Sequence, residues 1–302
     1  MRYPVIFLAL LLCVTLYGCT GEIPVETTQL PETTVEPTTN VTTIPTTIPV
    51  ITGWVEENGS RYYYDDEGIP VSGWQEIENC TYYFREDGTM ATGEVIIDGT
   101  ACFFTSQGKQ FILVNPWNYI PEGYEPDLVS LSTDHGVQGS MVDRSCYDAL
   151  VAMIDDCNKV CPEASVVSSY RSQGHQEYNY ERKVQYYLDK GYDRERAKRE
   201  AAQIIAIPGT SEHQLGLAVD IVDTRLSALE WEQENLPAQK WLMENCWKYG
   251  FILRYPKDKI DVTGIIYEPW HYRYVGKELA AELYGLGLTL EEYFHSLTDA
   301  VG

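Results

Sequence analysis

Positive charge is scarce in this 302-residue sequence, which has 22 lysines and arginines against 45 aspartates and glutamates, for a formal net charge of −23. No nucleic-acid partner is therefore expected, because phosphate binding needs a basic face. Long apolar runs are scarce as well: the one that stands out covers residues 5–17, and a membrane-spanning helix needs about 20 residues. A glycine-rich phosphate loop and a Cys-x-x-Cys metal knuckle are also missing. These absences favour an acidic, exported protein.

The first 19 residues have the pattern of an export signal. Arg2 precedes the apolar run, which is typical of a secretory signal peptide. The run ends in Leu16-Tyr17-Gly18-Cys19, which is similar to the cleavage box of bacterial lipoproteins. We therefore predict a lipoprotein-type signal peptide over residues 1–19 and a membrane anchor through a lipid on Cys19. Plain secretion and an uncleaved anchor are the alternatives, and each places the chain at the extracellular face of a bacterial cell membrane or in the cell wall.

Threonine and proline dominate the next segment. Residues 21–50 contain ten threonines and five prolines, which is half of the segment. Such a composition cannot bury enough apolar surface to fold, and its prolines keep the chain extended. We predict a linker over residues 20–50.

Residues 51–110 contain an internal repeat of 20 residues. Gly53-Trp54 recurs as Gly73-Trp74 and then as Gly93-Glu94, and an aromatic trio followed by a glycine lies between successive copies. An aromatic run that ends at a glycine turn indicates one β-hairpin for each unit. These units resemble the cell-wall-binding repeats, also called choline-binding repeats, of Gram-positive surface proteins. The third unit has Glu94 in place of tryptophan and is expected to cap the array.

The resemblance to wall-binding repeats implies a role for the aromatic side chains. In such repeats, Trp and Tyr from neighbouring units build a cage that can hold a quaternary ammonium by cation–π attraction or stack on a sugar ring. A cell-wall glycan or teichoic acid is the partner that this implies. The alternative is that the aromatic side chains only hold thin hairpins together. The candidate wall-binding residues are Trp54, Tyr63, Trp74 and Tyr83.

Beyond residue 110 the periodicity changes to short strands between helices. Helical spacing and caps predict helices over residues 143–160, 176–188, 194–205 and 238–249. Strands are predicted over residues 165–169, 217–222, 251–255 and 271–275. Thr289-Leu290-Glu291-Glu292 is a capping box that opens a final helix. We predict an α+β domain over residues 111–302, with mixed helices and a short antiparallel sheet, preceded by the β-hairpin repeats.

Six cysteines follow the signal segment. An even number in an exported protein permits disulfides, although their spacing does not select a pairing. The alternative is that they are small buried apolar residues. They are Cys80, Cys102, Cys146, Cys157, Cys161 and Cys246.

Two of the five histidines stand in patterns that suit a metal site. His213 precedes Asp220 by seven residues, so a loop histidine and a strand aspartate can direct their side chains into one pocket. Gly216, between them, would let the loop approach the strand closely. His271 can complete a three-ligand site, and two histidines with one aspartate suit Zn²⁺ with one position open for water. Glu268 is then available as a general base.

A histidine and an aspartate alone are more often a hydrogen-bonded pair, so the specificity lies in the combined pattern. Ser-x-His-x-x-Gly-x-Ala-x-Asp, followed by Glu-Pro-Trp-His, resembles the VanY-type zinc D-alanyl-D-alanine carboxypeptidase family, which cleaves peptidoglycan stem peptides. The resemblance runs from about residue 113 to residue 293. It implies that His213, Asp220 and His271 hold Zn²⁺ and that Glu268 is the catalytic base.

The same resemblance implies how the substrate is held. Arg171 would grip the free terminal carboxylate, which agrees with the bidentate pairing of guanidinium and carboxylate groups. Ser211 would help to hold that carboxylate, and Gln176 would line the pocket. Trp270 either forms the floor of the pocket or serves packing.

The activity that follows from the resemblance is a zinc-dependent D,D-carboxypeptidase that removes the terminal D-Ala of pentapeptide stems at the cell envelope. Two alternatives stay open at this point. An L,D-carboxypeptidase acting on tetrapeptide stems would use the same residues, and a wall-binding protein with an inactive catalytic domain would keep only the repeats.

Overall fold

The computed structural model describes residues 49–299. The predicted signal peptide, Cys19 and almost all of the predicted linker lie outside the described residues. Within residues 49–299, no helix has the length and apolar character needed to cross a membrane.

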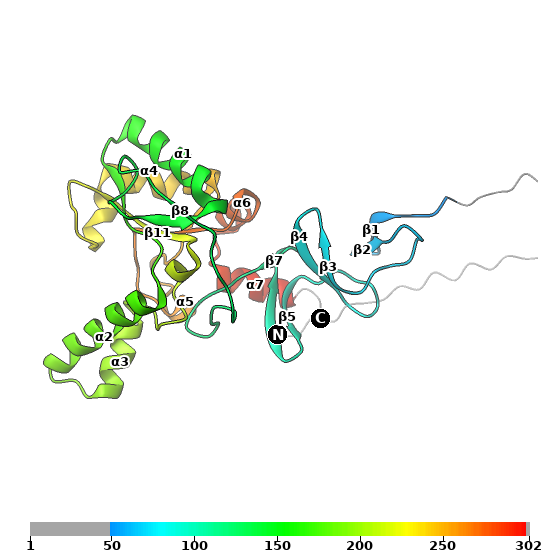
Figure 1. Ribbon diagram of the computed structural model, residues 1–302, viewed down its shortest axis with the longest axis horizontal. Helices are drawn as coiled ribbons and strands as arrows, with labels where there is room; N and C mark the ends of the chain where they lie inside the picture. Colours follow the sequence, from blue (N-terminus) through cyan, green and yellow to red (C-terminus); the bar gives the residue numbers. More distant parts are fainter. Residues whose placement is uncertain (1–48, 300–302) are drawn as a thin grey trace, which may run out of the picture. The chain divides into compact units, whose positions relative to one another are not determined.

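The repeats form antiparallel hairpins, as predicted (Figure 1). The same register recurs in each hairpin, so that Trp54 faces Tyr63, Trp74 faces Tyr83 and Glu94 faces Phe103. A short strand adds to the last hairpin. The strands are β1 (Gly53–Glu57), β2 (Ser60–Tyr64), β3 (Gly73–Ile77), β4 (Cys80–Phe84), β5 (Gly93–Ile97), β6 (Thr100–Phe104) and β7 (Gln110–Phe111).

An antiparallel four-stranded sheet organises the rest of the chain, which confirms the predicted α+β class. Its strand order is β10 (Ala164–Ser168), β11 (Ala218–Asp223), β13 (His271–Tyr274) and β12 (Phe251–Leu253). The helices α1 (Arg144–Val160) and α4 (Pro237–Asn245) pack on one face of this sheet and bury the main apolar core. A separate pair, β8 (Leu128–Ser130) and β9 (Met141–Asp143), lies beside α1.

Of the remaining helices, α2 is as long as α1 and the others are shorter. The helices α2 (Gln173–Asp189) and α3 (Arg194–Ala202) form a helical hairpin, with both helices side by side in Figure 1. The predicted helix over 238–249 is split, because its last turn tightens into the 3₁₀ helix η3 (Cys246–Tyr249) before Gly250. The remaining elements are η1 (Glu212–Leu215), η2 (Trp231–Asn235), α5 (Ile260–Thr263), α6 (Lys277–Leu286) and α7 (Leu290–Asp299).

The last helix, α7, connects the repeats to the sheet domain. Its start is the predicted capping box, in which Glu292 accepts from the Thr289 amide at 3.0 Å and Thr289 accepts from the Glu292 amide at 3.3 Å. On the repeat side, Phe294 packs against Phe103 with ring centroids 5.4 Å apart, and the Glu94 amide donates to Thr298 at 3.0 Å. The third hairpin therefore ends the array by docking on α7.

All six cysteines of the described chain are free thiols. Cys146, Cys157 and Cys246 are buried in the main core, where burial raises the pKa of each thiol to about 12. These three are confirmed as small buried apolar residues, and the permitted disulfides are not formed in this structure.

Candidate metal centre and active site

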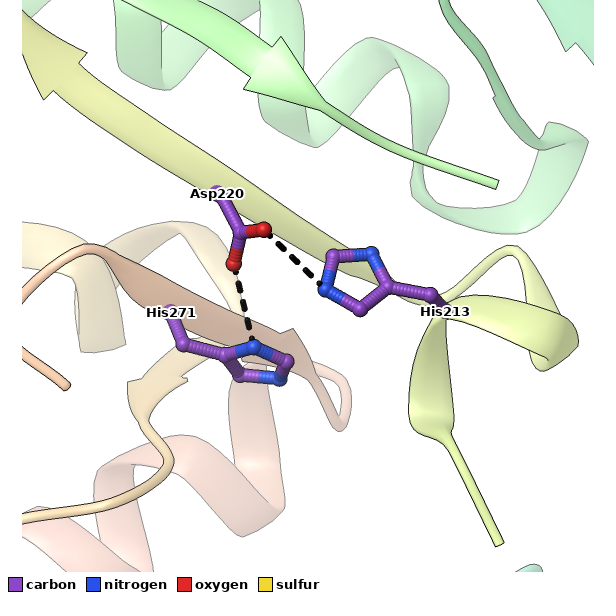
Figure 2. A group of neighbouring side chains, drawn as sticks. All are labelled: His213, Asp220 and His271. Carbon is purple, nitrogen blue, oxygen red and sulfur yellow. Dashed lines mark hydrogen bonds and ion pairs between the residues drawn. The ribbon is translucent and has the colours of Figure 1, made fainter. Parts of the chain in front are cut away.

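The sheet register brings the two distant segments of the candidate site together. Asp220 on β11 lies directly opposite His271 on β13, and directly paired residues of antiparallel strands project to the same face. The neighbouring positions Val219 and Ile221 point to the helix-covered core, so Asp220 and His271 project from the opposite face. His213 reaches this face from η1, and Figure 2 shows the three side chains converging.

Gly216 closes η1 where the sequence requires a small residue. Its φ of +72° is left-handed, and a Cβ there would lie 3.0 Å from the Asp143 amide nitrogen. A larger residue would push η1, and His213 with it, away from β9. The close approach that Gly216 permits is therefore to β9, whereas the sequence predicts it against the strand that carries Asp220.

The geometry of the three side chains suits one small cation. The His213 Nε2 lies 3.3 Å from Asp220 Oδ2, and the His271 Nδ1 lies 3.1 Å from Asp220 Oδ1. One potential ligand atom from each residue lies within 4.8 Å of the others. The His213 Nδ1 donates to the Ser169 carbonyl at 2.8 Å, which leaves the Nε2 lone pair facing the aspartate. This donor set, two imidazoles and one carboxylate, fits Zn²⁺.

The pKa values of the three candidate ligands are all shifted, and not in the same direction. Burial lowers the pKa of His213 to about 4, so its imidazole is neutral and can act as a ligand. For His271, burial also favours the neutral ring, but the negative charges of the neighbouring Asp220 and Glu212 outweigh it and raise the pKa to about 9. The pKa of Asp220 lies well below its ordinary value, because the stabilising contacts from the neighbouring His213, His271 and Arg171 outweigh the effect of burial. A cation bound here would take the place of the His271 proton.

Glu268 lies beside this cluster, as predicted. Its carboxylate is 3.6 Å from the His271 Nδ1, and burial raises its pKa to about 8. A raised pKa suits a group that must accept and then release a proton near neutrality. Glu268 shares a cavity of about 210 Å³ with the three candidate ligands and with Ser211 and Trp270.

Arg171 also faces the cavity, and its guanidinium is already partly engaged. Its Nη2 donates to Asp220 at 2.8 Å and to Ser168 at 2.9 Å. The Nη1 reaches Gln176 only at 3.5 Å and is the least engaged part of the group. Gln176 is fully buried behind Arg171 and donates to the Ala206 carbonyl at 2.7 Å. Gln176 therefore lies behind Arg171 and not on the cavity wall, where the sequence predicts it.

The aromatic residues of the repeats gather into two clusters, one on each tryptophan. In the first cluster, Trp54 packs against Tyr63 and Tyr82, with ring centroids 5.2 and 5.0 Å away, and Arg61 places its guanidinium carbon 4.6 Å from the ring centroid of Trp54. In the second, Trp74 packs against Tyr83 and Phe104 at 5.2 and 5.8 Å.

The two clusters differ in what covers them. The repeat places Cys102 where the first cluster has Tyr82, and Thr81 where it has Arg61. Trp74 is 43% exposed. The first cluster is therefore more enclosed and carries an internal cation, whereas the second is more open.

Sequence reasoning missed a buried charged layer beneath the metal centre. Glu212, Arg254 and Arg273 are each at most 1% exposed, and Glu212 accepts from both arginines. The signal was present: Arg254 follows the short apolar strand β12, and Arg273 interrupts the aromatic strand β13. Neither arginine has an obvious reason to be buried there unless an acidic partner lies in the interior.

Comparison with known proteins agrees with this geometry. The family model described as D-alanyl-D-alanine carboxypeptidase (VanY) matches residues 139–277, and models of a putative cell-wall-binding repeat and a choline-binding repeat match residues 52–69 and 71–114. A solved structure of a mutant vancomycin-resistance D,D-pentapeptidase VanY in complex with Zn(II) is 42% identical, with a TM-score of 0.54, over 60% of this chain and 97% of that one.

The chain belongs to the VanY family.

Two further proteins are similar to this chain. The LdcB LD-carboxypeptidase structure is 36% identical, with a TM-score of 0.54, over 68% of this chain and 94% of that one. A D-alanyl-D-alanine carboxypeptidase of Enterococcus faecalis is 42% identical over 185 residues, which cover 61% of this chain and 65% of the relative. The match thus spans slightly less than two thirds of that relative's length. The two similar solved structures are a D,D-pentapeptidase and an LD-carboxypeptidase.

Proposed function

We propose that this protein is a zinc-dependent D,D-carboxypeptidase that hydrolyses the terminal D-Ala from peptidoglycan pentapeptide stems. The observation that carries the proposal is the buried convergence of His213, Asp220 and His271, with Glu268 at the same cavity. The VanY relative solved with Zn(II) supports zinc as the metal held by these three residues.

The side chains of the cavity divide the chemistry between them. When bound, zinc supplies a Lewis acid that polarises the scissile carbonyl and lowers the pKa of a nucleophilic water. Glu268 accepts the proton of the attacking water and passes it to the departing amine. Arg171 and Ser211 hold the free carboxylate of the substrate, so that only the last peptide bond reaches the metal. Trp270, 7% exposed at the cavity, supplies an apolar wall.

A second candidate is an L,D-carboxypeptidase that removes D-Ala from tetrapeptide stems. The similarity to the LdcB LD-carboxypeptidase favours it. Both reactions need the same metal, base and carboxylate clamp, and they differ in the configuration of the residue that precedes the scissile bond. The 42% identity to the D,D-pentapeptidase over 97% of its length favours the D,D reading.

The rest of the chain would bring this site to its polymeric substrate. We propose a lipidated Cys19 after a signal peptide over residues 1–19, a linker over 20–50, wall-binding hairpins over 51–110 and the peptidase domain over 111–302. Trp54, Tyr63, Trp74 and Tyr83 would contact a cell-wall glycan or teichoic acid. The protein would then act at the extracellular face of a bacterial cell membrane, held there by lipid and wall contacts.

Synthetic stem peptides test the activity and the preference together. Purified protein loaded with zinc is incubated with a pentapeptide stem ending in D-Ala-D-Ala and with a tetrapeptide stem ending in one D-Ala, and the products are weighed by mass spectrometry. Loss of one alanine from the pentapeptide alone supports the D,D reaction, and loss from the tetrapeptide alone supports the L,D reaction. Two intact peptides, from a sample shown to contain zinc, would refute the hydrolase. The Glu268→Gln protein serves as the matched control for contaminating peptidases.

A further inference from the structure

Glu212 lies at the centre of the buried charged layer, immediately before His213 in the chain. Its Oε1 accepts from Arg254 Nε at 2.8 Å and from Arg273 Nη1 at 3.0 Å. Its Oε2 lies 3.6 Å from His271 Nε2. Two cations therefore fix one carboxylate oxygen, while the other faces the ring of a candidate metal ligand.

The two atoms that face each other are both unsatisfied. Within residues 49–299, Glu212 Oε2 and His271 Nε2 are buried side-chain atoms with no hydrogen-bond partner at normal distance. Buried polar atoms without partners are rare in proteins, because each one costs free energy. A closer approach of a few tenths of an ångström would satisfy both atoms with a single bond.

We propose that Glu212 is a positioning residue for the metal centre, which accepts the Nε2 proton of His271 and thereby presents the His271 Nδ1 lone pair to the metal. The inference rests on the proposed function, because it assigns a role to Glu212 only if a metal is bound. Histidine ligands of metals almost always donate their second ring nitrogen to a carboxylate, a carbonyl or water, which fixes the tautomer and the ring orientation. His213 already has such a partner in the Ser169 carbonyl. Glu212 gives His271 the equivalent contact.

The short helix η1 thus serves both histidines. Glu212 and His213 are consecutive residues of η1. One short helix therefore provides a candidate metal ligand, His213, and the carboxylate that would support another candidate ligand, His271. The two arginines supply the positive charge that a buried carboxylate needs, because each donates to Glu212 Oε1. Arg254 is held in turn by Glu291 of α7, whose oxygens lie 2.9 and 2.5 Å from Nη1 and Nη2.

Zinc affinity separates this role from a merely structural one. The metal-free proteins are titrated with zinc in competition with a chromogenic chelator, and their melting temperatures are recorded without metal. Glu212→Gln is expected to weaken zinc binding about 10–100-fold, which is the usual loss when such a partner is removed. Glu291→Gln is the matched control, because it removes the other carboxylate of Arg254 without touching His271. It should lower the melting temperature while changing zinc affinity less than about threefold.

The outcomes are distinct. Wild-type zinc affinity in a folded Glu212→Gln protein would overturn the positioning role, and so would an equal loss of affinity in Glu291→Gln. Failure of the unaltered protein to bind zinc would refute the proposed function instead. If Glu212→Gln does not fold, nitrogen NMR of the histidines in the zinc-loaded wild-type protein decides. The role requires a protonated Nε2 on His271, and a protonated Nδ1 would overturn it.

Discussion

The candidate metal centre and the aromatic repeats both bring together side chains from separate segments of the chain, but the first is buried and the second is partly exposed. His213, Asp220 and His271 are at most 4% exposed, and their positions depend on sheet register and a charged layer beneath them. Trp74 is 43% exposed and rests on its own hairpin and the next one. A buried polar site needs partners for every charge, whereas a half-exposed aromatic surface needs only neighbours of suitable shape.

This difference determines how each region should respond to substitution. In the metal centre, removal of one side chain leaves buried partners unpaired, so effects should be large and specific. In the repeats, water and neighbouring rings can compensate, so effects should be smaller and more local.

The largest effect is expected from Glu268→Gln. Loss of the proton acceptor should lower the turnover of stem peptides by about 10²–10⁴-fold, since general acid–base catalysis contributes on that scale. Steady-state kinetics on the preferred peptide measures the loss. Glu268 is not one of the three candidate ligands, so zinc content by elemental analysis should stay unchanged. Turnover equal to that of the wild-type protein would remove Glu268 from the base role.

Arg171→Ala is the next largest. A hydrogen bond to a charged group contributes about 1.5–3 kcal/mol, so loss of the carboxylate clamp should raise KM roughly 10–100-fold. Arg171 also contacts Asp220, so zinc affinity is measured alongside the kinetics. Arg171→Lys keeps the charge and should recover only part of the loss, because the forked geometry is gone. An unaltered KM in a zinc-replete Arg171→Ala protein would rule out the clamp.

The two regions also differ in how far the sequence predicted them. Hairpins follow from a 20-residue period with glycine turns. The candidate ligands could be named because each half of the site stands in a short motif, one with His213 and Asp220 and one with Glu268 and His271. The two halves are 51 residues apart, and it was the resemblance to the VanY family that joined them. The charged layer could not be predicted in the same way. Glu212 lies 42 residues from Arg254 and 61 from Arg273, and only the pairing of β11, β12 and β13 brings them together.

A smaller effect is expected from Trp74→Ala, which tests whether the repeats bind the wall or only hold themselves together. If the exposed ring contacts wall polymer, the substitution should reduce co-sedimentation with isolated cell walls while hydrolysis of free stem peptides stays unchanged. Trp54→Ala is the comparison, because Trp54 packs against three aromatic rings and should affect the stability of the hairpins more. Undiminished sedimentation with both variants would favour the aromatic residues as structural staples.

The smallest effect concerns Arg61, whose guanidinium lies over the Trp54 ring where an external quaternary ammonium would bind. Arg61→Thr introduces the residue that the second repeat has at the equivalent position, Thr81. Removal of the internal cation should strengthen choline binding to the first cluster a few-fold, in line with the roughly 0.5–1 kcal/mol of an exposed cation–π contact. Tryptophan fluorescence during choline titration measures it, with Thr81→Arg as the reciprocal variant that should weaken any binding at Trp74. If Arg61→Thr binds choline no better than the wild-type protein, Arg61 does not compete for this aromatic face, and the enclosure of the first cluster comes from its rings alone.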